Sequence, residues 1–426
     1  MKLAFFGYAW NPELQIDAYM TETIASLART GADVDVYLGG QLSSEYGIYG
    51  LKDTVSIDAL QQFMVTQDYD AAISFNNSML IPQVLDALRG RVVTVIVDEP
   101  EHLFDYLRVG PWEVFRQDVE IFAMSSALER RVREQVEDVD ARLHFALPAT
   151  HIDLESRGTA ASYPISWVAS YVGDRNLDLF LKLITEAPQY HALTVKCLDL
   201  LARDGDLKAV KDEDGADAAL IRTLPWTFDF FQAQMLNILT NRSRVAVVER
   251  LAPHGLALFG NANWQKLLSH NAAVLKSLRP GPARVTHADL RQVYNASKIS
   301  INLPQAHSTQ DAVQYRVIDV LASNALMITQ HSPTSDLYRV FGIDCPIPTY
   351  RDLDELEQLC VHFLNNEAER LALVERCNAL VATGFSFDER AIDYLRIARL
   401  APSAAPAQGA VRWIDLGVFP AEPRAG

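Results

Sequence analysis

The sequence predicts a two-domain α/β protein with mostly parallel sheets. Short apolar runs of strand length alternate with helical patterns in the first half, as in "KLAFFGY" (2–8) and "RVVTVIVDEP" (91–100). The alternation starts again after a polar stretch at 149–164. Strands that alternate with helices form βαβ units, which require a parallel sheet with helices on both faces. A chain of 426 residues is also long enough to bury two cores.

The individual elements follow in chain order. The first domain is expected over residues 1–160, with a helix at 13–30 and strands at 2–8, 32–39, 70–75, 91–100, 119–125 and 142–148. The second domain is expected over 161–385, with helical patterns at 186–240 and strands at 165–173, 255–260, 298–303 and 325–329. Residues 386–426 are expected to form a crossover helix and a tail, which from 401 onward reads as a loosely packed strap.

Composition and charge exclude several classes of protein. A net charge of −16 argues against a general affinity for nucleic acid or for anionic membranes. The four cysteines form no CxxC pair, so neither a zinc site nor a disulfide framework is expected. No apolar run reaches the roughly 18 residues of a membrane span, and the N-terminal run is too short for a signal peptide. We expect a cytoplasmic protein without a transmembrane segment, of unknown oligomeric state.

The stretch "QDAVQYRVIDVLASNALMIT" (310–329) carries the main candidate site. On a helix that begins near 310, Asp311 lies at the helix start, where free backbone N–H groups favour an anion. Arg316 is then a cation for a phosphate, and Asp319 is an acceptor for a ribose diol. The alternative is structural: Ser308 and Asp311 fit a capping box, and Arg316 with Asp319 fits a surface pair.

The surrounding residues resemble the C-terminal domain of the CgeB-like (spore-maturation type) glycosyltransferases. The matching motifs, spread over roughly residues 165–398, are "ISWVASYVGDR", "VYNASKISINL", "RVIDVLASNALMIT" and "YRDLDEL". The resemblance implies a GT-B fold, in which two Rossmann-like domains face each other across a cleft. It also implies metal-independent transfer of a sugar from a nucleotide-sugar donor to a hydroxyl acceptor on a glycan, a polysaccharide or a protein, with no cofactor.

Two residues depart from the family's pattern. Asp319 stands where Glu is usual and Asn324 where Gly is usual. The spacing of Asp311 and Asp319 is similar to that of two Glu residues separated by seven others in retaining enzymes of the glycogen- and sucrose-synthase type. The sequence does not indicate whether the anomeric configuration is retained or inverted.

Loops at the ends of expected strands supply the other donor-side candidates. The resemblance makes Arg175 a phosphate cation, and Gly173 a point of close backbone approach. Backbone N–H groups of the 303–310 loop are expected to cradle a diphosphate, and His307 to face the sugar. The donor-side candidates are Gly173, Arg175, Gly260, Asn261, His307, Ser308, Thr309, Arg316 and Asp319. Structural alternatives are a surface arginine after a turn and an exposed loop histidine, and Trp264 is expected to be a packing residue.

The first domain supplies the acceptor-side candidates. Gly7 and Tyr8 follow the first strand and are expected to line the cleft, although a tight strand–helix turn also explains Gly7. Carboxylates that end a buried strand often face a cleft, where a base or a positioning partner for an acceptor hydroxyl is needed. The catalytic candidates are Asp98, Glu99, His102 and Asp311. A solvated turn fixed by proline explains the first three equally well.

Other classes of protein remain as alternatives. The chain has no GxGxxG fingerprint, which weakens a dinucleotide-dependent oxidoreductase. It has no D-x-D motif placed after a strand, so no metal site is expected. A GT-B nucleotide-sugar epimerase, or a non-catalytic protein that binds a sugar nucleotide, fits the same donor site. A periplasmic binding protein also has two α/β domains, but the expected signal peptide is missing.

Overall fold

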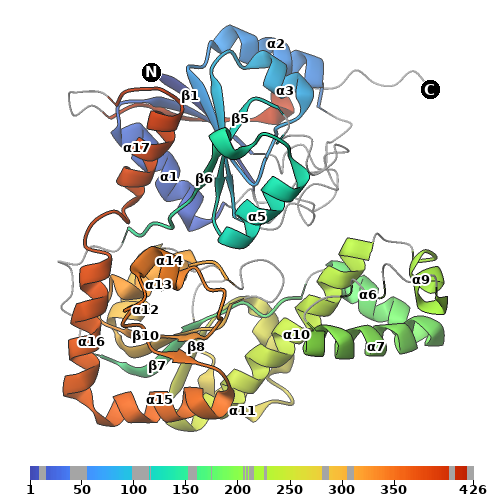
Figure 1. Cartoon of the computed structure of the whole chain (residues 1–426), viewed down its shortest axis with the longest axis vertical. Coiled ribbons are helices and arrows are strands. Elements are labelled where there is room, and N and C mark those ends of the chain that lie inside the picture. Colours follow the sequence, from blue (N-terminus) through green and yellow to red (C-terminus); the bar gives the residue numbers. More distant parts are fainter. Residues whose placement is uncertain are drawn as a thin grey trace.

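The computed structural model describes residues 1–8, 16–38, 55–97, 115, 117–151, 161–173, 175–204, 207, 210, 215–224, 228–280, 287–304, 311–402 and 408–419. Their strands form two separate sheets, stacked one above the other in Figure 1 with helices around each. Neighbouring strands of both sheets run parallel. The predicted α/β class with parallel sheets is therefore confirmed.

The first unit contains a seven-stranded sheet in the order β12-β2-β1-β3-β4-β5-β6. The strands are β1 (Lys2–Gly7), β2 (Asp33–Leu38), β3 (Ala71–Phe75), β4 (Arg91–Ile96), β5 (Val119–Ala123), β6 (Leu143–Phe145) and β12 (Val411–Ile414). The helices are α1 (Ala18–Arg29), α2 (Ile57–Gln67), α3 (Pro82–Ala87), α5 (Ser126–Gln135) and α17 (Phe387–Ile397). The central strands are buried on both faces, which explains why they read as continuous apolar runs.

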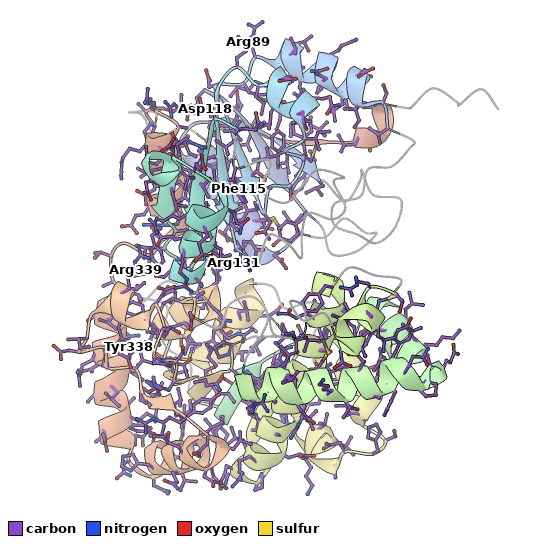
Figure 2. The ribbon with its side chains drawn as sticks, turned by 45° about the vertical axis from the view of Figure 1, so that its right-hand side comes forward. Arg89, Phe115, Asp118, Arg131, Tyr338 and Arg339 are labelled. Carbon is purple, nitrogen blue, oxygen red and sulfur yellow. The ribbon has the colours of Figure 1, made fainter. Side chains whose placement is uncertain are left out.

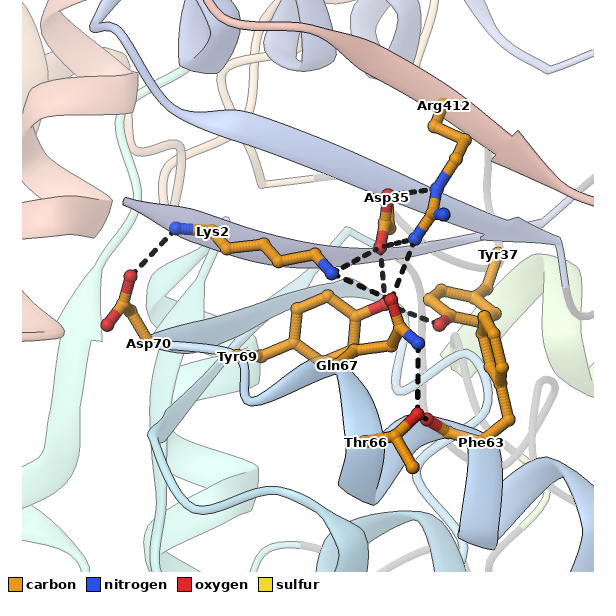
Figure 3. Close-up of polar contacts among 9 residues, drawn as sticks. All are labelled: Lys2, Asp35, Tyr37, Phe63, Thr66, Gln67, Tyr69, Asp70 and Arg412. Carbon is orange, nitrogen blue, oxygen red and sulfur yellow. Dashed lines mark hydrogen bonds and ion pairs between the residues drawn. The ribbon is translucent and has the colours of Figure 1, made fainter.

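The described part of the C-terminal segment belongs to this first unit, and its residues 411–414 form a paired strand where a loosely packed strap was expected. Helix α17 packs against α1, and β12 pairs with β2. The guanidinium of Arg412 binds both oxygens of the buried Asp35, at 2.8 and 2.6 Å, and Tyr69 donates to the same carboxylate at 2.6 Å (Figure 3). Although burial raises the pKa of Asp35, the bonds from Arg412 and Tyr69 hold it below its usual value. The prediction missed this strand because its four residues follow an Ala/Pro-rich stretch.

The second unit contains a five-stranded sheet in the order β11-β10-β9-β7-β8. The strands are β7 (Tyr163–Val168), β8 (Leu256–Phe259), β9 (Ser297–Asn302), β10 (Leu326–Gln330) and β11 (Thr349–Tyr350). The helices around them are α10 (Phe228–Leu251), α11 (Ala272–Ser277), α12 (His287–Asn295), α13 (Tyr315–Leu321), α14 (Leu337–Phe341), α15 (Leu353–Asn365) and α16 (Glu367–Leu380). The two faces of this sheet are covered by separate apolar clusters.

A helical arm extends sideways from the second unit, at the right of Figure 1. It consists of α6 (Arg175–Glu186), α7 (Pro188–Asp204), α9 (Ala216–Ile221) and the first half of α10. The arm has its own apolar core, which includes Phe180, Cys197 and Phe231. The second half of α10 packs on the sheet through Val247, Val248 and Leu251, so this one helix joins the arm to the sheet.

Two chain crossings connect the units. One is the segment after β6, and the other is the segment between α16 and α17. The two segments form a parallel bridge between Thr150 and Ser386. The Ser386 hydroxyl caps α17 in a capping box with Glu389, which is the sequence reason for the helix start. Among the described residues, no helix is both long and apolar enough to span a bilayer.

Candidate functional site

Strands β9, β7 and β8 lie side by side in the second sheet, and the described residues that follow β7 and β8 form the candidate site together with Arg316. The loop after β7 is fixed by side chains from its neighbours. The amide of Asn241 on α10 bonds both backbone groups of Val172, at 2.8 and 2.6 Å, and Asn261 after β8 does the same for Tyr171, at 2.9 and 3.0 Å. The indole N–H of Trp264 donates to the Ala169 carbonyl at 2.7 Å. Asn263 also donates to two carbonyls of this loop, so its backbone is preorganised by hydrogen bonds with neighbouring side chains.

The two glycines among the donor-side candidates have clear packing reasons. A Cβ on Gly260 would lie 2.1 Å from the Ala169 carbonyl oxygen, so only glycine fits there. A Cβ on Gly173 would lie 3.3 Å from both Asn263 Cγ and Lys266 Nζ, which is tight but less restrictive. Trp264 is fully buried, as expected for a packing residue. Contact of Gly173, Gly260 or Asn261 with a donor stays a prediction.

Arg244 is the main residue that the sequence analysis missed. It lies on α10 with only 1% of its surface exposed, and its Nη1 donates to the carbonyl of Ser170 after β7. Its Nε has no hydrogen-bond partner within the described part of the chain. Burial and, to a smaller extent, the charge of Arg316 together lower the pKa of Arg244 to about 9. The guanidinium is nevertheless protonated at neutral pH.

Arg316 is the second residue of α13. Its side chain lies at the end of β9, close enough to Arg244 for its charge to affect that residue's pKa. Its Nη1 lies 3.4 Å from Oδ1 of Asn302, the last residue of that strand. The neighbouring Tyr294 is buried, and burial raises the pKa of its phenol, whereas Arg316 acts to lower it. Neither Arg244 nor Arg316 forms an ion pair with a carboxylate among the residues that the structure describes.

Two arginines, Arg244 buried and Arg316 partly buried, therefore share a site in which neither forms an ion pair within the described chain, although the Asp319 carboxylate lies close enough to feel the charge of Arg316. Like charges in a desolvated site repel each other, and buried charges are normally paired. An anion with several oxygens, such as a diphosphate, would relieve both costs, because each guanidinium presents several donors in a fixed fork. The arrangement is thus suited to bind a polyphosphate at the ends of β7 and β9.

Asp319 lies one turn further along α13 and is almost completely buried, with 3% of its surface exposed. Thr150 from the chain crossing donates to its Oδ1 at 2.6 Å. Burial raises the pKa of Asp319 to about 7, while the Thr150 hydroxyl and the charge of Arg316 act in the opposite direction. The surface-pair alternative is therefore wrong for Asp319, and a ribose contact stays a prediction.

The predicted position of Asp311 at a helix start is wrong. Helix α13 begins at Tyr315 with Gln314 as its N-cap, so Asp311 precedes the helix and neither binds its first turn nor completes a capping box within it. Its Oδ1 instead accepts hydrogen bonds from the hydroxyls of Ser332 and Thr334, both at 2.7 Å. The sequence pattern allowed an earlier start because Val313 is apolar and keeps the helical spacing.

Tyr8 and Gly7 lie at the end of β1, in the first unit. Tyr8 is fully buried, and its hydroxyl forms a short hydrogen bond with that of Tyr19 on α1. Tyr19 stacks on Tyr315 with ring centroids 4.9 Å apart and an interplanar angle of 6°. A Cβ on Gly7 would meet the side chains of Phe5, Leu38 and Met20 at 3.3–3.4 Å. Tyr19 thus links Tyr8 to Tyr315, the first residue of α13, while an acceptor contact stays a prediction.

The remaining candidates lie outside what the structure describes. Asp98, Glu99, His102, His307, Ser308 and Thr309 are outside the described residues. Arg175 is the first residue of α6, but its side chain is likewise outside them. Among the described residues, no group of three or more His, Cys, Asp or Glu side chains is placed to hold a metal ion.

Comparisons with known proteins identify the architecture. Residues 242–396 match a family model described as glycosyl transferase-like. The structure of HepE from Anabaena in complex with UDP-glucose is similar with a TM-score of 0.56 and 11% identity, covering 93% of this chain and 99% of HepE. Sucrose-phosphate synthase from Thermosynechococcus elongatus is similar with a TM-score of 0.56 and 10% identity, covering 94% of this chain and 98% of that one. No curated protein sequence matches the chain.

These likenesses show the fold. The chain has the GT-B fold, with two facing Rossmann-like units of parallel strands and helices, as the resemblance implied. The matched family model begins at residue 242, just after the helical arm and two residues before Arg244. The arm separates the loop after β7 from Arg244 along the chain, so no local motif joins the two.

Proposed function

We propose that this GT-B chain is a glycosyltransferase that moves a sugar from a nucleotide-sugar donor to a hydroxyl acceptor. The family model over 242–396 and the fold shared with HepE, which was solved with UDP-glucose, support an enzyme of this class. The observation that carries the proposal is that the buried Arg244 and the partly buried Arg316 come together at the ends of the parallel strands. Ligands of open α/β sheets bind at this edge.

The two arginines have a clear role in such a reaction. Sugar transfer breaks the bond between the anomeric carbon and the diphosphate, so negative charge develops on the leaving oxygens. Fixed cations in a desolvated site stabilise that charge without reorganisation at the moment of reaction. Arg244 and Arg316 are proposed to bind the diphosphate of the donor, and Asp319 to accept a hydrogen bond from its ribose. The preorganised loop at 169–173 supplies the backbone wall of this site.

Transfer without a bound metal is part of the proposal. Two guanidinium groups supply the cationic charge that a divalent ion would otherwise provide. Turnover is expected to persist within twofold in excess chelator, and a loss of activity that a divalent cation restores would refute this part. Membership of the CgeB-like subtype, an acceptor hydroxyl on a glycan, polysaccharide or protein, and a cytoplasmic location are proposed with it.

The test is turnover with a panel of nucleotide sugars, read as release of the nucleoside diphosphate. The donor is first selected by thermal shift, because ligand binding raises the melting temperature by mass action. Arg316→Ala and Asp319→Ala are expected to weaken donor binding in calorimetry while the fold persists. Unchanged donor affinity in both variants would overturn the assignment. A sugar isomerised in the absence of acceptor would instead identify an epimerase, and binding without any turnover a non-catalytic protein.

A further inference from the structure

The two units are joined by a set of contacts between α5 and α14, which we call the interdomain clamp. Asp336 from the second unit accepts from the backbone N–H of Ser126 at 2.9 Å and also bonds its hydroxyl. Arg339, one turn later, donates to the Ser126 hydroxyl at 2.7 Å and to Glu129 at 2.5 Å. Its guanidinium carbon also lies 3.8 Å from the ring centroid of Phe145. Figure 2 shows Arg339 at the boundary between the two units.

The two carboxylates of the clamp are desolvated, whereas Arg339 is partly exposed, with 43% of its side chain accessible. Asp336 is 2% exposed and Glu129 is 5% exposed. A buried carboxylate costs free energy unless it is hydrogen-bonded, so both side chains favour the arrangement in which they meet their partners. The clamp therefore defines one relative position of the two units.

Asp311 is attached directly to this clamp. Its Oδ1 accepts from Ser332 and Thr334, and its carbonyl accepts from the backbone N–H of Asp336 at 2.7 Å. These three bonds fix the turn from 332 to 336, which ends at the residue that bonds Ser126. Asp311 also lies four residues before α13, the helix that carries Arg316. It is thus the point at which the arginine-bearing segment and the clamp meet.

We propose that Asp311 is a positioning residue that couples the donor side to the interdomain clamp, rather than a group that acts on the sugar. This inference rests on the proposed function, because the reaction needs the donor on one side of the cleft to be aligned with the acceptor on the other. The Asp311 carboxylate acts as a hydrogen-bond acceptor for the turn, and its charge has no part in the chemistry. Misplacement of reacting groups by about 1 Å can cost about a hundredfold in rate.

The test separates an acceptor role from a charged role. Asp311→Asn keeps an oxygen for the two hydroxyls, so it should keep kcat within about threefold. Asp311→Ala should lower kcat by tenfold or more and change the donor dissociation constant less than threefold, because Arg244 and Arg316 remain. Ser332→Ala/Thr334→Val removes the same two bonds from the other side and should match Asp311→Ala. Asp344→Ala, in an exposed loop after α14, is the matched control and should behave as the parent protein.

A distance measurement tests the clamp without any turnover. Spin labels at Arg89→Cys and Arg351→Cys, whose side chains are 74% and 75% exposed, report the separation of the units in a Cys345→Ser background. The parent protein should give one narrow distance distribution, and Asp311→Ala a broader one. A narrow, unchanged distribution in Asp311→Ala would overturn the proposal, as would an Asp311→Asn variant as inactive as Asp311→Ala. Failure of donor binding in the parent protein would refute the proposed function, while the distance result would still decide the clamp.

Discussion

Replacement of Arg244 by methionine is expected to change stability and ligand binding in opposite directions. Arg244→Met keeps most of the side-chain volume on α10 but removes a buried charge. In the ligand-free protein the free energy of unfolding should rise by about 1–3 kcal/mol, a range typical when buried charges are replaced by apolar residues. The affinity for a nucleoside diphosphate should fall by tenfold or more, because one of the two proposed phosphate-binding cations is gone.

The magnitude follows from the environment of the guanidinium. Burial, together with the charge of Arg316, lowers the pKa of Arg244 well below its usual value, to about 9, and at about 1.4 kcal/mol per unit this opposes the charged form by roughly 5 kcal/mol. Methionine removes that cost but loses the bond to the Ser170 carbonyl, which contributes about 1.5–3 kcal/mol as a bond from a charged donor. The difference between these two effects is an increase of a few kcal/mol in the free energy of unfolding.

Two measurements on the same samples check this prediction. Urea unfolding at pH 7.5 gives the change in stability, and calorimetric titration with UDP gives the change in affinity. Arg242→Met is the matched control, since Arg242 lies on the same helix but is exposed. It should leave both quantities unchanged within error. A destabilised Arg244→Met variant that binds UDP as tightly as the parent protein would show that Arg244 is a structural residue, and would refute the reasoning.

Three further predictions concern stability. Burial raises the pKa of Asp319 to about 7, so its ionisation costs stability as the pH rises from about 4 through 7. Asp319→Asn should therefore raise the free energy of unfolding, relative to the parent protein, more at pH 8 than at pH 5 in urea unfolding. An equal change at both pH values would contradict this. Gly260→Ala places a Cβ 2.1 Å from the Ala169 carbonyl oxygen and should lower the free energy of unfolding by about 1–3 kcal/mol, whereas no loss would show that the loop relaxes. Arg412→Met leaves the Asp35 carboxylate buried without its bidentate partner and should cost about 1–3 kcal/mol by the same assay; a neutral effect would show that β12 contributes little.

Most of the fold was predictable because the chain consists of βαβ units with strong periodicity. The six strands predicted in the first half each contain an observed strand, within a few residues at each end. The C-terminal strand β12 was not predictable, because its pairing with β2 joins residues about 380 apart. Its register depends on Arg412 reaching Asp35, which is a tertiary contact with no local signal.

The candidate site was predictable in part. Arg316 and Asp319 could be found because helical spacing and a family motif coincide there. Asp311 could be identified as a candidate residue, but its role could not be predicted, since its hydrogen-bond partners Ser332 and Thr334 are about 20 residues away. Arg244 had one local signal that was not used: a lone arginine on the same helical face as the apolar residues 247, 248 and 251. Such a residue is buried when the face packs on a sheet, and a buried arginine indicates an anion.

The central claim is that Arg244 and Arg316 together hold the diphosphate of a nucleotide sugar. A crystal structure of the protein with UDP, the nucleotide that a fold relative binds as UDP-glucose, tests it most directly. We predict phosphate oxygens within hydrogen-bonding distance of both guanidinium groups, at the ends of β7 and β9. A nucleotide bound elsewhere, or with its phosphates contacting neither arginine, would contradict the account.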